Sequence, residues 1–229
     1  VDNLFIFDND AWRQSAESVQ GGYAEINEKI VRRFGLLFRS GEIHPGQDVA
    51  ESVIDSSEII NTLSGGGIST VGYAETAVEE PPSQGLLDRL GGGSDPDIDS
   101  TDATNRITSL VRKATLGRLT LPCDVQGTER GLLVVAGPAP YLNRKGIEHG
   151  RKWLEEQTGS MEVRGGDFPY TEENTVATIV VLAGVTNVPR VKELQQVAIE
   201  AQDSIDDTED TREESQSALT DTDELESLF

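Results

Sequence analysis

VIDSSEIINTL, residues 53–63, places two carboxylates three residues apart at the start of an apolar-periodic run. An Asp at the N-cap followed three residues later by Glu is a capping-box variant, because the Asp accepts a backbone N–H and the Glu reaches back to the N–H of the cap. Asp55 and Glu58 therefore predict a helix from about residue 55 to residue 63. SGGG, residues 64–67, ends it, since glycine adopts the positive φ that terminates helices. Paired carboxylates can also perform chemistry, but on this stretch alone the helix start is the favoured interpretation.

Apolar periodicity predicts the other elements on both sides of this stretch. NLFIF, residues 3–7, indicates a short buried strand, and DND, residues 8–10, caps a helix that runs to about residue 19. A longer helix is expected from residue 22 to 38, with Ile26, Ile30, Phe34 and Leu37 on its apolar face and Arg33 on the surface. Further strands are expected at 68–77, 131–138 and, as a pair, at 160–168 and 175–185, with helices at 102–115, 144–157 and 189–202. This order predicts an α+β fold: a long central helix followed by a mixed sheet packed with helices.

Two segments have compositions that do not predict packed structure. Residues 79–101 are rich in Pro, Gly, Ser and Asp, which indicates a long loop or a partly ordered insertion. Residues 203–229 are acidic and aliphatic-poor, so we expect a disordered tail that cannot bury enough apolar surface to offset its ordering entropy. The tail ends in ELESLF, which is either solvated chain or a short peptide that docks on a partner.

The charge of the chain restricts its partners. The 229 residues carry 41 acidic and 19 basic side chains, a formal net charge of −22, which disfavours binding to nucleic acid or anionic membranes. The basic residues are 14 Arg and only 5 Lys, and the acidic excess is spread along the chain, which favours a protein adapted to concentrated salt. The alternative interpretation is a mesophilic protein with acidic tails. One cysteine and two scattered histidines predict no metal site made by these residues. The sequence has no signal pattern and no membrane-length apolar run, so we expect a cytoplasmic protein.

A second polar constellation precedes the acidic pair. Asn9 is expected to end the first strand, and Tyr23 and Asn27 lie at i and i+4 on the next helix, on one face. An aromatic ring beside an amide suits a flat heterocycle, because the ring stacks on it and the amide pairs with its edge. On spacing alone, a surface Tyr and an ordinary helix Asn remain the favoured interpretation.

Taken together, IFDND, YAEIN, PGQ and VIDSSE occur in an order that resembles the middle of a tubulin or FtsZ chain, and the archaeal CetZ group looks closest. The resemblance covers about residues 3–202. It implies that Asn9, Tyr23 and Asn27 contact guanine, and that Asp55 and Glu58 position and polarise the water that attacks the GTP of a neighbouring subunit. Val53 departs from the family pattern, which commonly has Asn there and uses it to contact the neighbour's nucleotide.

The resemblance also implies an organisation and a function. Residues 1–40 would be the end of a GTP-binding domain with its central helix, residues 41–202 the second, GTPase-activating domain, and 203–229 the tail. GTP or GDP with Mg²⁺ would be held mainly by a preceding half that carries the glycine-rich phosphate loop, so this chain alone is not expected to hydrolyse GTP. The implied protein polymerises into filaments and controls cell shape or division. The alternatives are an FtsZ-type division protein and a non-enzymatic acidic assembly or scaffold module.

Overall fold

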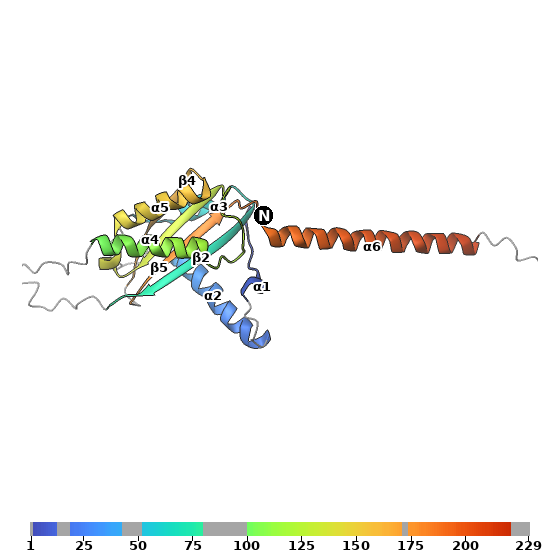
Figure 1. Ribbon diagram of the computed structural model, residues 1–229, viewed down its shortest axis with the longest axis horizontal. Helices are drawn as coiled ribbons and strands as arrows, with labels where there is room; N and C mark the ends of the chain where they lie inside the picture. The colour runs from blue at the N-terminus through green and yellow to red at the C-terminus, as the bar shows by residue number, and fades with distance from the viewer. Residues whose placement is uncertain (1, 13–18, 43–51, 80–99, 171–173, 221–229) are drawn as a thin grey trace, which may run out of the picture. The chain divides into compact units, whose positions relative to one another are not determined.

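The computed structural model describes residues 2–12, 19–42, 52–79, 100–170 and 174–220, which form an α+β fold (Figure 1). By contacts between residues, the chain divides into two units, Val1–Asn187 and Val188–Phe229. The first unit holds the sheet. Its strands are β1 (Leu4–Phe5), β2 (Ile68–Ala77), β3 (Arg130–Gly137), β4 (Glu162–Pro169) and β5 (Thr175–Ala183). Its helices are α1 (Asn9–Trp12), α2 (Val19–Ser40), α3 (Ser56–Leu63), α4 (Ser100–Leu116), the 3₁₀ turn η1 (Ala139–Tyr141) and α5 (Arg144–Thr158).

The five strands form one mixed sheet in the order β1-β2-β5-β3-β4. β3 and β4 are parallel, as are β1 and β2, whereas β5 runs antiparallel to both of its neighbours. The expected pairing of residues 160–168 with 175–185 is therefore wrong, because β3 lies between β4 and β5. Helix α5 connects β3 to β4, and such a crossover brings two parallel strands side by side. β5 then pairs on the other side of β3.

Helices cover both faces of this sheet. Side chains alternate along β3, and the strand is buried almost throughout, as expected for a central strand with both faces covered. Leu132, Val134 and Ala136 share a core cluster with residues of α2 and α3. On the other face, α4 and α5 lie side by side against the sheet (Figure 1). The acidic stretch around α3 is thus fixed by packing on the first of these two faces.

The central helix packs on the sheet largely as its periodicity predicts, although it begins at Val19 and ends at Ser40. Ile26 and Leu37 are buried. The prediction for Arg33 is wrong: its side chain is only 5% exposed. Its guanidinium lies 4.4 Å from the Trp12 ring centroid and 5.2 Å from that of Tyr73, and it donates to the carbonyl of residue 29 at 2.9 Å. Aromatic rings from α1 and β2 favour this cation when it is taken out of water.

In the second unit, the described residues are Val188 and the helix α6, Pro189–Thr220. The structure differs here from the disorder expected from residue 203, since the helix continues for a further 18 residues, 203–220. Helical hydrogen bonds are local and need no apolar core, and Glu, Gln, Ala and Arg are good helix formers. Side chains from Lys192 to Ser217 are exposed, so low apolar content predicts the absence of packing and not the absence of a helix. Residues 221–229, with the ELESLF stretch, lie outside the described residues.

Candidate functional site

The acidic pair begins α3. Asp55 has extended backbone angles, φ −108° and ψ 170°, and its Oδ1 accepts a hydrogen bond from the backbone N–H of Glu58 at 2.9 Å. This geometry confirms the predicted N-cap. Asp55 is exposed, and its carboxylate can accept further hydrogen bonds because its two oxygens offer about four acceptor positions. The cap therefore leaves capacity for a bound water.

Glu58 does not complete the capping box. No hydrogen bond joins its carboxylate to the N–H of Asp55, and both residues are among those described. The carboxylate instead forms an ion pair with Arg164 of β4, with Oε1 and Nη1 3.5 Å apart. Both side chains are partly exposed, and a pair in such a setting contributes little stability. Glu58 is thus oriented by a contact that is easily exchanged.

The segment that leads into α3 lies against β4. The backbone N–H of Ser52 donates to Asp167 Oδ1 at 2.6 Å, and the N–H of Asp167 donates to the carbonyl of Ser52 at 3.0 Å. Val53 forms a parallel bridge with Asp167, although its side chain is 59% exposed. Ile54, by contrast, is buried in the core shared with α2 and β3. The chain is therefore fixed at Ser52 and Ile54, directly before Asp55.

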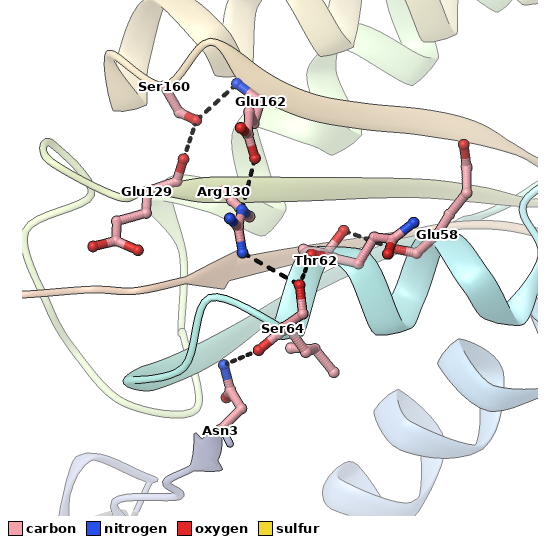
Figure 2. Close-up of polar contacts among 10 residues, drawn as sticks. Asn3, Glu58, Thr62, Ser64, Glu129, Arg130, Ser160 and Glu162 are labelled. Carbon is pink, nitrogen blue, oxygen red and sulfur yellow. Dashed lines mark hydrogen bonds and ion pairs between the residues drawn. The ribbon is translucent and has the colours of Figure 1, made fainter.

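The other end of α3 is also held by polar contacts (Figure 2). The Asn3 amide donates to the carbonyls of Leu63 and Gly66 at 3.2 and 3.3 Å. Arg130 reaches Ser64 Oγ at 3.5 Å with one nitrogen and Glu162 at 2.6 Å with another. The Arg130 bonds connect the C-terminal end of α3 to the beginnings of β3 and β4, and the Asn3 bonds connect it to the residue before β1. Polar contacts to β4 are therefore found at both ends of the short helix.

The residues predicted to contact guanine lie on α1 and α2. Tyr23 and Asn27 are both exposed and lie one turn apart on α2, so the face they form is open to a ligand. Asn9 does not end a strand: β1 ends at Phe5, and Asn9 is the first residue of α1. The side chain of Asp8 accepts from the N–H of Asp10 at 3.0 Å, which starts α1 as the DND stretch predicts.

A cavity of about 460 Å³ lies beside α2 but does not involve this face. Its lining includes Trp12, Arg33 and Tyr73, and neither Tyr23 nor Asn27. Burial lowers the pKa of the Arg33 guanidinium to about 10. Burial, and then a hydrogen bond to Glu75, raise the pKa of Tyr73. The cavity is therefore distinct from the predicted guanine face.

Within the described ranges, no three His, Cys, Asp or Glu side chains gather in a way that could hold a metal ion. Among the helices of that part of the chain, none is both long and apolar enough to cross a membrane. His44 and the PGQ stretch lie outside the described ranges.

The family described as "Tubulin-like CetZ, C-terminal domain" matches residues 16–200. The chain belongs to this family. Tubulin-like protein CetZ1 of Haloferax volcanii is 68% identical over 211 residues, which cover 90% of this chain and 53% of that protein. The chain thus spans about half the length of the curated relatives it matches.

Solved structures of the family show the same fold. CetZ1 from Haloferax volcanii, a GDP-bound monomer, superposes with a TM-score of 0.72 at 61% identity, covering 88% of this chain and 51% of that one. CetZ2 from the same organism, a GTPγS-bound protofilament, gives a TM-score of 0.71 at 37% identity, covering 90% of this chain and 53% of that one. An FtsZ dimer of M. jannaschii, 16% identical, shares the fold with a TM-score of 0.56 over 79% of this chain and 45% of that one.

The β4 residues that contact the chain before Asp55 are not among the predicted site residues. By itself, the sequence VRGGDF predicts only a strand. Two adjacent glycines inside a strand indicate a bulge or the close approach of another backbone, and here the second of them faces the chain before Asp55. That signal, followed by an acid, could have indicated that β4 supports the acidic stretch.

Proposed function

We propose that this CetZ-family chain belongs to a filament-forming GTPase in which Asp55 and Glu58 of one subunit act on the GTP held by the next. The observation that carries the proposal is the carboxylate pair at the start of α3, with Asp55 exposed and Glu58 partly exposed, fixed from both sides by the core and by β4. That the CetZ2 relative is described as a GTPγS-bound protofilament supports the assembled state as the active one.

The acidic pair would act on water. A carboxylate can accept a hydrogen bond from water and orient its oxygen toward the γ-phosphate, as general bases and water-positioning residues do. Asp55 keeps acceptor positions free while it caps α3, and Glu58 exchanges its ion pair with Arg164 for the water. Hydrolysis would then require two stacked subunits, because the water-positioning pair and the nucleotide belong to different chains.

The guanine base would be held by α2. Tyr23 offers a ring for stacking, and the Asn27 amide offers both a donor and an acceptor one turn away. Asn9 at the start of α1 is the third proposed contact. Mg²⁺ would supply charge neutralisation on the phosphates, and the described residues offer no cluster for it. We place the phosphate-binding groups elsewhere in the protein that carries this chain.

The test uses the complete protein in concentrated salt. Glu58→Ala is expected to bind GTP and to sediment with GTP as the wild type does, while its turnover falls by roughly 10²–10⁴-fold. Asn27→Ala is expected to weaken GTP binding instead. Glu148→Ala, which removes an exposed carboxylate from α5, is the matched control and should change neither.

Two results would count against the proposal. Unchanged hydrolysis in Glu58→Ala would remove the catalytic assignment. Absence of GTP-dependent sedimentation in the wild type would favour the acidic scaffold module. We also propose that such filaments control cell shape or act in FtsZ-type division. The place in the cell where the filaments form would distinguish these two roles.

A further inference from the structure

The segment immediately before the acidic pair rests on one glycine of β4. A Cβ atom placed on Gly166 would lie 2.1 Å from the carbonyl oxygen of Ser52 and 2.8 Å from Cγ1 of Ile54. The first of these atoms is backbone and cannot rotate away. The chain at residues 52–54 can therefore take its position only because residue 166 has no side chain.

The neighbouring residue fixes the same segment by hydrogen bonds. Asp167 is 5% exposed, and it holds Ser52 from both directions: its Oδ1 accepts from the N–H of Ser52 and its own N–H donates to the Ser52 carbonyl. Hydrogen bonds to a buried carboxylate are stronger than those between neutral groups. Gly166 and Asp167 thus form what we call the loop seat.

We propose that the loop seat consists of positioning residues that set how far Asp55 and Glu58 reach toward the neighbouring subunit's nucleotide. The inference rests on the proposed function, since it concerns the rate of the same reaction. Ser52 is bound to the seat and Ile54 is buried in the core. Because Asp55 follows these residues directly, a shift of residues 52–54 displaces Asp55 as well. Asp55 in turn caps α3, which carries Glu58.

Gly166→Ala is the first test. To relieve the contact, the Ser52 carbonyl must retreat from 2.1 Å to the ordinary range that begins at 3.4 Å, a shift of more than about 1 Å. A misplacement of that size costs up to about a hundredfold in rate. In the complete protein we therefore expect turnover per sedimented subunit to fall by roughly 10–100-fold, with the KM for GTP unchanged, because the guanine face lies on α2.

The adjacent glycine provides the matched control. A Cβ on Gly165 would meet nothing closer than 3.5 Å, which is ordinary contact with Arg151 and Leu133. The Ser52 hydroxyl donates to the carbonyl of residue 165, which alanine retains. Gly165→Ala should therefore show wild-type turnover. Equal losses in the two variants would mean that β4 is merely intolerant of substitution, and would overturn the proposal.

Asp167 provides a second, chemically different test. Asp167→Asn keeps an oxygen that can accept from the Ser52 N–H, whereas Asp167→Ala removes it. We expect Asp167→Ala to lose turnover as Gly166→Ala does and Asp167→Asn to recover most of it. Hydrogen exchange of the peptide covering residues 52–58 should be faster in Gly166→Ala and Asp167→Ala than in the wild type. Unchanged exchange would show that the seat does not hold the segment.

Failure of this inference can be distinguished from failure of the proposed function. If Glu58→Ala loses turnover while Gly166→Ala retains it, the pair is catalytic but the seat does not position it. If Glu58→Ala retains turnover, the catalytic assignment itself is wrong. If Gly166→Ala fails to sediment with GTP, the exchange measurement on the unassembled protein still decides whether the seat holds residues 52–58.

Discussion

Asp55 has two tasks in this structure, and one pair of substitutions separates them. Its Oδ1 caps α3, and its negative charge is proposed to polarise water. Asn is as good an N-cap as Asp, whereas Ala cannot cap and typically costs about 1 kcal/mol. Asp55→Asn should therefore keep the helix start and lose the charge, while Asp55→Ala should lose both.

The size of the stability effect follows from the geometry. The cap satisfies the N–H of Glu58 at an exposed helix end, so its loss should lower the free energy of unfolding by about 0.5–2 kcal/mol. For a domain of this size, 1 kcal/mol corresponds to a melting temperature roughly 2–4 °C lower. Loss of the charge at a helix N-terminus would cost a further ~0.3–1 kcal/mol at low salt. Unfolding in about 1 M KCl, where the Debye length is near 3 Å, suppresses that second contribution.

The assay follows tryptophan fluorescence during unfolding. Trp12 and Trp153 both lie in the unit that contains the sheet, so the signal reports on that unit and not on α6. In high salt we expect Asp55→Asn to match the wild type and Asp55→Ala to melt about 2–4 °C lower. In the complete protein both variants should lose GTP turnover. If Asn destabilises as much as Ala, the side-chain oxygen is not the cap; if Asn keeps full turnover, the charge of Asp55 is not needed for hydrolysis.

Two further predictions concern the packing of the sheet and the single thiol. A Cβ on Gly72 would lie 2.0 Å from the carbonyl oxygen of Ala114, so Gly72→Ala should destabilise the chain by about 1–3 kcal/mol in urea unfolding. Gly35→Ala, whose Cβ meets nothing within 4 Å, is the control, and equal stability of the two variants would contradict the packing of α4 on β2. Burial, with a smaller contribution from Asp124, raises the pKa of Cys123 to about 11. Because only the thiolate reacts, alkylation at pH 8 should be about a hundredfold slower in the folded chain than in urea, with the difference closing as the pH approaches 11. Equal rates at pH 8 would show that the partial burial of the thiol does not raise its pKa.

The features that were predicted correctly depend on short-range sequence signals. Asp55 as a cap, the helix that follows it and the extent of β2 each follow from neighbouring residues, because capping and periodicity are local properties. The resemblance in the order of motifs supplied the family, which the sequence comparison confirmed. The guanine contacts and the catalytic roles remain predictions.

The features that were missed depend on partners distant in the sequence. Arg33 lies seven residues after Ile26 and four before Leu37, so its spacing places it on the apolar face of α2. Its charge favours exposure, and Trp12 and Tyr73 on other elements make its burial favourable. The position of β3 between β4 and β5 is set by the crossover through α5, which periodicity does not report. Gly166 and Asp167 likewise acquire their role from Ser52, more than a hundred residues earlier in the chain.

The contact between Ser52 and β4 has one more consequence, which concerns solubility. β4 is the last strand of the sheet order, and an uncovered outer strand offers free backbone groups to strands of other molecules. Residues 52 and 53 cover part of the outer edge of β4 through the hydrogen bonds to Asp167 and the bridge formed by Val53. The charged Glu162 and Arg164 on the same strand discourage further pairing with another chain. A substitution that releases residues 52 and 53 would therefore expose the unpaired edge of β4. Loss of activity and a tendency to aggregate should then appear together.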